Sequence, residues 1–238
     1  MSTEMEWTLT SGAIPSHTVI DISEAIAFVT LQHVKPNTFS DLKIRDKPDL
    51  RSADNSTGIE VTSAIPRESH EASSIFTHLS EKGDKKRAQS IQQIQKCGGE
   101  LISLPTEGGS SVDVMVGPVS LHYFDTVHKC HKAKLEKLNG GGYTEFSHQQ
   151  LYIQSDIRSD DLTNQRELSK MITEASVFQK RYELIYLSVP EHVYLFDLLK
   201  QSVVDITVAL EDQEAWSLEA RKKVYEDECR SKKSTAAK

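Results

Sequence analysis

The chain has 238 residues, of which 37% are hydrophobic and 26% charged, and its formal net charge is −7 at pH 7. A chain of this length can bury one good core with room for an extra lobe, and its clusters of Val, Ile, Leu and Tyr exclude a disordered protein. The acidic balance argues against a protein that coats nucleic acid indiscriminately, but it still allows a nuclease with a local basic groove.

The cysteines and the N-terminus indicate a cellular compartment. Cys97, Cys130 and Cys229 are widely spaced and odd in number, which fits a reducing cytoplasm better than a disulfide framework. The start, Met-Ser-Thr-Glu-Met-Glu-Trp, is acidic and lacks the apolar core of a secretory signal. The longest apolar run, around 25–31, is too short to span a bilayer. We therefore expect a soluble, cytoplasmic protein without membrane contact.

Apolar periodicity and turn residues predict helices and strands in the first half of the chain. After an N-terminal extension over 1–19, Asp21 or Ser23 caps a helix that ends before Pro36. The following predicted elements are strands around 42–44 and 59–65, a long polar helix over 68–97 interrupted near Gly83, and strands at 100–104 and 112–116.

The second half continues the alternation. A helix over 119–138 carries apolar residues and histidines along one face: Leu121, Phe124, His128, His131, Leu135 and Leu138. The next predicted elements are a strand at 151–153, a helix over 163–180, and a hairpin of strands at 182–189 and 192–197. This order suits an α/β fold with a mixed central sheet flanked by helices. We expect one domain over 20–210, followed by a charged helical tail over 211–238.

The stretch 48–64 carries the clearest chemical signal. A run of turn formers over 52–57 separates two short segments that contain apolar residues, 49–50 and 59–61. If these segments pair as a hairpin, Asp49 and Glu60 lie side by side at a sheet edge. Two adjacent carboxylates repel each other unless a cation lies between them, and Mg²⁺ is the natural cation for such oxygens. The alternative is a turn aspartate beside a solvent-facing strand glutamate.

Pro48-Asp49, followed by Gly58-Ile59-Glu60-Val61-Thr62, resembles the PD-(D/E)xK nuclease superfamily, which has the restriction-endonuclease-like fold. The resemblance implies that Asp49 and Glu60 hold Mg²⁺ or Mn²⁺. It also implies a further ligand in the backbone carbonyl of Val61 and a third acid in Glu24, unless Glu24 is an ordinary surface residue. In this family a lysine two residues after the glutamate orients the attacking water, and Thr62 occupies that position here. The resemblance covers about 20–200, but only 48–64 is specific to it.

An active site of this kind needs a lysine from elsewhere in the chain. The candidates are Lys82, Lys85 and Lys86 in the helix over 68–97, and Lys132 and Lys134 in the helix over 119–138. Long lysine stems can stretch along an apolar surface toward a sheet edge, although any single lysine more commonly lies on a solvated face. We assign Lys134 to the predicted catalytic set, together with Asp49, Glu60 and Thr62.

The resemblance implies Mg²⁺-dependent hydrolysis of a nucleic-acid phosphodiester, favours DNA over RNA and leaves a homodimer open. Basic clusters over 82–87 and 129–137 either line a phosphate backbone or are balanced by neighbouring acids on exposed helices. Two other functions stay open. One is a binding or assembly protein on the same core with a decayed site, and the other is a metal-dependent hydrolase of small phosphates.

Four residues of the helix over 119–138 suggest a zinc site: His122, His128, Cys130 and His131. Zinc sites of this type need a second Cys or His pair at matching spacing, and none follows. The sequence therefore favours core or edge histidines at these positions.

Overall fold

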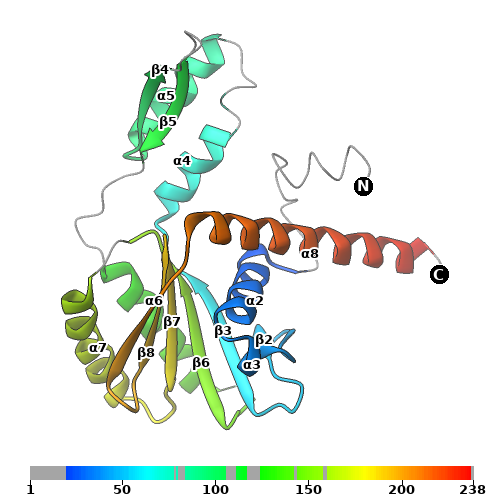
Figure 1. The fold of residues 1–238 in the computed structure, drawn as a ribbon, viewed down its shortest axis with the longest axis vertical. Coiled ribbons are helices and arrows are strands. Elements are labelled where there is room, and N and C mark those ends of the chain that lie inside the picture. The colour runs from blue at the N-terminus through cyan, green and yellow to red at the C-terminus, as the bar shows by residue number, and fades with distance from the viewer. Residues whose placement is uncertain are drawn as a thin grey trace. The chain divides into compact units, whose positions relative to one another are not determined.

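The structure is a computed structural model that describes residues 20–77, 79, 84–105, 111–116, 124–141, 144–157 and 160–236. The expected N-terminal extension over 1–19 lies outside the described residues. The contacts divide the chain into two compact units, one formed by Met1–Ala64 with Tyr123–Lys238 and the other by Ile65–His122. We call them the core unit and the inserted unit and describe each by itself (Figure 1).

The core unit is built on a seven-stranded mixed sheet with the strand order β1-β2-β3-β6-β7-β8-β9. The strands are β1 (Lys43–Ile44), β2 (Leu50–Arg51), β3 (Thr57–Ser63), β6 (His148–Gln154), β7 (Leu184–Val189), β8 (His192–Asp197) and β9 (Ser202–Thr207). The central strands β3, β6 and β7 run parallel, and the strands on either side of them pair antiparallel. The predicted α/β class with a mixed sheet flanked by helices is confirmed.

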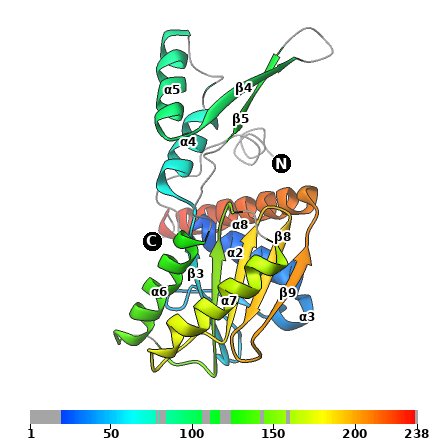
Figure 2. The same cartoon turned by 90° about the vertical axis from the view of Figure 1, so that its left-hand side faces the viewer.

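Helices cover both faces of this sheet (Figure 2). They are α2 (Ile22–Val34), α3 (Pro36–Phe39), α6 (Asp125–Asn139), α7 (Asp161–Ser176) and α8 (Leu210–Ala236). Successive side chains of a strand point to opposite faces. Ile59 and Val61 of β3 therefore pack with Leu31 of α2, whereas Leu151 of β6 packs with Leu135 of α6 on the other face.

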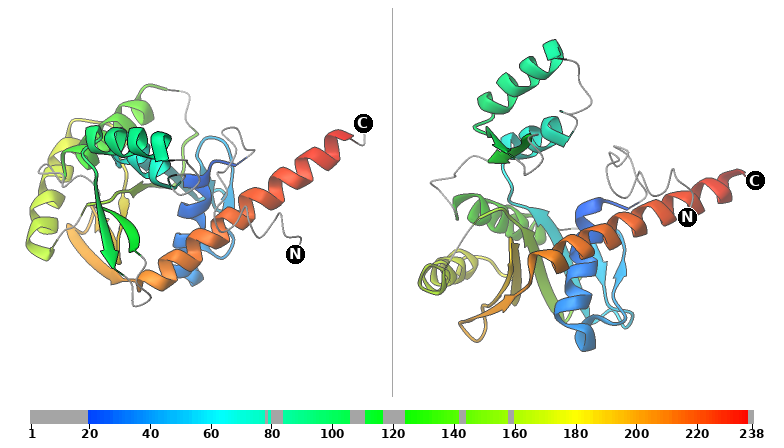
Figure 3. Two further views of the ribbon diagram at one scale, coloured as in Figure 1. Left: turned by 90° about the horizontal axis from the view of Figure 1, so that it is seen from above. Right: turned by 45° about the horizontal axis from the view of Figure 1, so that its top comes forward.

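The C-terminal helix α8 belongs to the core unit (Figure 3). From the sequence we expect a charged helical tail over 211–238. In the structure Ala220 and Val224 of this helix are buried against Ala25 and Val29 of α2. These two α8 residues lie one helical turn apart, so they form a narrow apolar stripe within an otherwise polar helix. Such a stripe is too short to be conspicuous in the sequence.

The inserted unit contains two helices and a β-hairpin. Its elements are α4 (Arg67–Thr77), α5 (Asp84–Lys96), β4 (Glu100–Pro105) and β5 (Ser111–Val116), with β4 and β5 antiparallel. It has its own small core around Ala72, Ile94 and Cys97. From the sequence we expect one continuous domain over 20–210. The structure instead has two compact units, because the helices and the hairpin of the inserted unit bury apolar side chains against each other.

Most predicted elements are present with shifted ends. The pairing of 49–50 with 59–61 is confirmed by the register of β2 and β3, and the hairpin of 182–189 with 192–197 by β7 and β8. The helix predicted from 119 begins at Asp125, and Leu121 and Gly83 lie outside the described residues. The three cysteines are free. Within the described part of the chain, no helix combines the length and apolar character needed to cross a membrane.

Candidate active site

The β2–β3 hairpin brings Asp49 to Glu60. Leu50 lies opposite Ile59 in an antiparallel register, so the preceding residue on one strand, Asp49, falls opposite the following residue on the other, Glu60. The turn between them is closed by its own polar groups, because the side chain of Asp54 accepts hydrogen bonds from the Ser52 hydroxyl at 2.6 Å and the Ser56 N–H at 2.9 Å. The polar turn residues therefore set the register that places the two acids together.

Asp49 is fixed by the backbone of β3. Its Oδ2 accepts a hydrogen bond from the Val61 N–H at 2.7 Å. Burial raises the pKa of the Asp49 carboxyl above its ordinary value, and the hydrogen bond from Val61 only partly opposes this effect. The N–H and C=O of one strand residue point to the same side of the strand, so the Val61 carbonyl also faces the edge where Asp49 lies.

Glu60 is buried and meets a lysine. Its side chain is 3% exposed, and its Oε2 accepts a hydrogen bond from Lys134 Nζ at 2.8 Å. The same ammonium lies 3.8 Å from Asp49 Oδ2. A solvent-facing strand glutamate is therefore excluded at position 60. The structure brings together three members of the predicted catalytic set, Asp49, Glu60 and Lys134.

Helix α6 presents Lys134 to the acids. Its buried face packs on the sheet through Leu135 and Leu138, and the Tyr182 hydroxyl donates a hydrogen bond to the Lys134 carbonyl at 3.3 Å. Only 16% of the Lys134 side chain is exposed. An ammonium between two acids in a partly buried setting interacts with them more strongly than it does at an open surface.

Glu24 lies within electrostatic reach of this cluster from helix α2. Asp21 caps that helix by accepting a hydrogen bond from the Ser23 N–H at 2.7 Å, which places Glu24 in the first turn. Burial, followed by the negative charges of Asp49 and Asp21, raises the pKa of Glu24 to about 7. Burial contributes most to this rise, and the charge of Glu24 is also coupled to that of Asp49.

Thr62, the position at which the nuclease resemblance predicts a lysine, interacts with Cys130 of α6. The Cys130 thiol, one turn before Lys134 on α6, donates a hydrogen bond to the Ser63 carbonyl at 3.3 Å. Burial raises the pKa of this thiol, while a hydrogen bond with the Thr62 side chain and the charge of Lys134 partly oppose the rise. Thr62 thus contributes to the packing of α6 against β3. The ammonium group beside the two acids belongs to Lys134 of α6.

The other candidate lysines lie elsewhere. Lys132 is exposed on α6. Lys85 and Lys86 belong to α5 of the inserted unit, and Lys82 lies outside the described residues. One residue that the sequence analysis placed only in a basic cluster, Lys137, does act on the site, because its positive charge lowers the pKa of Asp49. Its spacing of three from Lys134 puts both on one helix face and is the signal that was available.

The histidines of α6 form an ion-pair cluster with α7. His128 Nε2 lies 2.7 Å from Glu167 Oε2 and its Nδ1 lies 2.9 Å from Glu174 Oε1. His131 Nδ1 lies 3.1 Å from Glu174 Oε2, and Cys130 points instead to β3. The histidines thus join α6 to α7.

The donor set at the hairpin fits a hard divalent cation. No group of three or more His, Cys, Asp or Glu side chains among the described residues has an arrangement for binding a metal. Mg²⁺, however, is commonly held by one or two carboxylates while water and substrate phosphate complete its shell. Asp49, Glu60 and the Val61 carbonyl are oxygen donors of this kind. The Lys134 ammonium lies 2.8 Å from Glu60 Oε2 and 3.8 Å from Asp49 Oδ2.

Comparison with known proteins gives no match to a protein-family model, to a curated protein or to a solved structure.

Proposed function

We propose that the protein is a metal-dependent nuclease on a restriction-endonuclease-like core, with the catalytic lysine supplied by helix α6. The observation that carries the proposal is the convergence of Lys134 Nζ on Glu60 Oε2 and Asp49 Oδ2. Two acids and a lysine make up the charged part of the PD-(D/E)xK motif. Here the helix provides the ammonium on the face of the sheet where Thr62 cannot.

The residues would divide the chemistry between them. Asp49, Glu60 and the Val61 carbonyl would hold Mg²⁺ or Mn²⁺, whereas Glu24 forms no three-acid group with Asp49 and Glu60 in the described part of the chain. The bound metal would polarise the phosphate and lower the pKa of the attacking water. Lys134 would orient that water and offset negative charge that develops on the phosphate. In this scheme Thr62 only supports the packing of α6.

The first test is cleavage of labelled single- and double-stranded DNA and RNA with Mg²⁺ or Mn²⁺. We expect the wild type to cut, with DNA preferred over RNA. Asp49→Asn, Glu60→Gln and Lys134→Met should each reduce the rate about a hundredfold or more, the usual effect of removing one group that stabilises the transition state. Lys132→Met is the matched control, because it removes an exposed lysine from the same helix and should leave the rate unchanged.

Lys134→Arg separates chemistry from folding. This variant keeps the positive charge beside the buried acids, so thermal melting should stay close to that of the wild type. The planar guanidinium cannot reproduce the compact ammonium, so cleavage should still fall. Metal-dependent cleavage that survives in Lys134→Met, or its absence in the wild type, would contradict the proposal.

A second function is favoured by the same contact. The Lys134 ammonium already neutralises Glu60 and approaches Asp49, and Thr62 supplies no second cation. A binding or assembly protein on this core requires no metal ion. An ion pair that already occupies the two acids is therefore compatible with that function. Folded wild type without cleavage under any metal would favour this function over the nuclease.

A further inference from the structure

Helix α5 of the inserted unit carries an ordered polar stripe. Lys85, Gln89, Gln92 and Lys96 follow one another at spacings of four, three and four residues, and all four are exposed. These spacings place them on one face of a helix. Ile94, which is 0% exposed, lies on the opposite side and packs in the core of the inserted unit. We call these four residues the α5 stripe.

The order of the residue types along the stripe is informative. Lysines stand at its two ends and glutamines in the middle. The helical rise of about 1.5 Å per residue separates the backbones of Lys85 and Lys96 by about 16 Å. The major groove of B-form DNA is about 12 Å wide and admits a helix. A helix of this kind can therefore place its terminal ammonium groups at phosphates while its central amides face base edges.

Glutamine amides suit this position chemically. A glutamine side chain donates and accepts at once, and it can pair with the N6 and N7 atoms of adenine in the major groove. The deep, narrow major groove of A-form RNA does not admit side chains in this way. The pattern of Lys85, Gln89, Gln92 and Lys96 thus favours duplex DNA.

The charges around the stripe are consistent with a polyanionic partner. Helix α5 (Asp84–Lys96) contains four basic residues and one acid, Asp84 at its first position, although the whole chain has a net charge of −7. Two acids on neighbouring elements are occupied by α5 side chains outside the stripe. Asp113 of β5 forms an ion pair with Arg87, and Glu71 of α4 accepts a hydrogen bond from the Gln93 amide at 3.1 Å.

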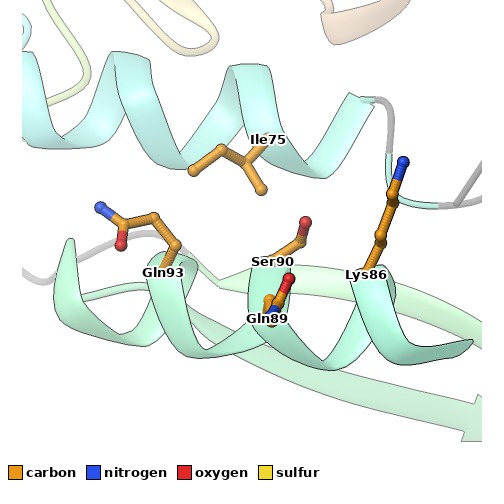
Figure 4. A pocket seen from close by; sticks show the side chains of 5 residues that line it. All are labelled: Ile75, Lys86, Gln89, Ser90 and Gln93. Atoms are coloured by element: carbon orange, nitrogen blue, oxygen red, sulfur yellow. The ribbon is translucent and has the colours of Figure 1, made fainter.

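A hollow between α4 and α5 lies next to the stripe (Figure 4). It is open, has a volume of about 340 Å³ and is lined by Ile75, Lys86, Gln89, Ser90 and Gln93. Gln89 belongs both to this hollow and to the stripe. Lys86, another lining residue, is exposed and adds an ammonium group on the α5 side of the hollow.

We propose that the inserted unit binds duplex DNA, with the α5 stripe in the major groove. The inference deepens the proposed nuclease function and rests on it for the choice of nucleic acid as the partner. The chain enters the inserted unit just after Glu60 and leaves it shortly before α6, which carries Lys134. The DNA-reading surface is thereby tethered at both ends to elements that carry the candidate active site.

The test is a binding measurement that does not depend on cleavage. Fluorescence anisotropy of the full chain with a labelled DNA duplex of random sequence, in EDTA, gives the affinity over a range of salt concentrations. Each lysine that contacts a phosphate steepens the salt dependence, so Lys85→Ala and Lys96→Ala should each reduce the log–log slope by about 1. Gln92→Glu keeps the side-chain shape but adds negative charge, and should weaken binding about tenfold.

Matched controls lie on helices of the core unit. Lys222→Ala on α8 and Gln165→Glu on α7 make the same charge changes at exposed positions and should leave affinity and slope unchanged. Circular dichroism shows whether each variant is folded. Equal effects in stripe and control variants, failure of the wild type to bind duplex DNA, or a preference for RNA would each overturn the inference.

The cleavage assay on the same variants separates this inference from the proposed function. Weak binding by the stripe variants without cleavage by any protein would support the inference and reject the nuclease. Cleavage by the wild type together with normal binding by the stripe variants would support the nuclease and reject the α5 surface.

Discussion

At the scale of single residues, Lys134 shows that the ammonium beside Glu60 and Asp49 comes from a helix and not from β3. A lysine at position 62 would extend from the same strand as Glu60 and on the same face. Helix α6 covers that face, and its Lys134 reaches Glu60 Oε2 at 2.8 Å. A lysine on β3 or a lysine on α6 can therefore place an ammonium group beside Glu60.

Glu24 gives a pH-dependent prediction. Its pKa is raised from 4.5 to about 7, so the fold favours the neutral acid. The stability that the neutral form contributes is complete below about pH 4.5 and is lost as the pH rises through 7. Glu24→Gln should therefore raise the free energy of unfolding at about pH 8 by about 1 kcal/mol. This figure is well below the roughly 3.4 kcal/mol that a rise of about 2.5 pKa units represents at about 1.4 kcal/mol per unit, because solvent screens a partly exposed carboxyl.

Urea denaturation at about pH 8 and pH 4 measures this effect. The gain should be present at the higher pH and absent at the lower one. Glu214→Gln, on the exposed side of α8, is the control and should change nothing at either pH. A Glu24→Gln variant that is less stable than the wild type at the higher pH would show that the ionised carboxylate is the favoured form.

The site residues differ in how far the sequence could define them. Asp49 and Glu60 follow from turn chemistry and the spacing of the motif, since a hairpin across 52–57 can hardly avoid pairing them. The choice between Lys132 and Lys134 could not be made in the same way, because both flank the apolar stripe of α6. The rotation of α6 on the sheet decides between them, and that rotation depends on the packing of Leu135 and Leu138.

At the scale of elements, β3 holds the site through a close backbone contact. A Cβ at Gly58 would lie 2.7 Å from Phe146 Cδ2 and 3.0 Å from Pro48 Cγ. Gly58→Ala should therefore overpack this end of the hairpin and lower the free energy of unfolding by about 1–3 kcal/mol. Because Pro48 precedes Asp49, the substitution should also reduce any metal-dependent cleavage.

Chemical denaturation and the cleavage assay both report on this change. Gly140→Ala is the control, because the nearest atom to its Cβ would be the Glu136 carbonyl oxygen at 3.3 Å and the backbone there is helical. We expect a change of less than about 1 kcal/mol for this variant. Equal stability of Gly58→Ala and the wild type would mean that the Phe146 ring moves aside freely.

Strand β9 shows which elements the sequence leaves undefined. Ser202–Thr207 pairs with β8 at the edge of the sheet, and much of it is exposed, including Val204 and Asp205. An edge strand with polar and apolar residues on both faces lacks the clean alternation that predicts a half-buried strand. The interior strands β7 and β8 are rich in buried Ile, Leu, Val and aromatic residues, and the sequence predicts them well.

At the scale of the whole molecule, the hydrophobic clusters follow the division into two units. Among the residues that the structure describes, the clusters on both faces of the seven-stranded sheet contain none of Ile65–His122, and the cluster around Ala72, Ile94 and Cys97 contains only residues of that segment. Replacement of Ile65–His122 by a short Gly/Ser linker should therefore leave a core unit that folds on its own.

Thermal and urea unfolding followed by circular dichroism test this prediction. We expect one cooperative transition, with an m-value reduced in proportion to the smaller surface that unfolding exposes. Phe196→Ala in the shortened chain is the comparison, because Phe196 is 0% exposed and its truncation should cost about 3–5 kcal/mol. A shortened chain without a cooperative transition would show that the sheet depends on the inserted segment for its stability.

The division of the chain between Ala64 and Tyr123 also has an evolutionary consequence. Substitutions inside Ile65–His122 leave the sheet clusters untouched, so this segment can diversify by mutation or exchange while Asp49, Glu60 and Lys134 are retained. Homologues should accordingly vary most between the codons for Ala64 and Tyr123, and chimaeras joined at those two positions should remain folded.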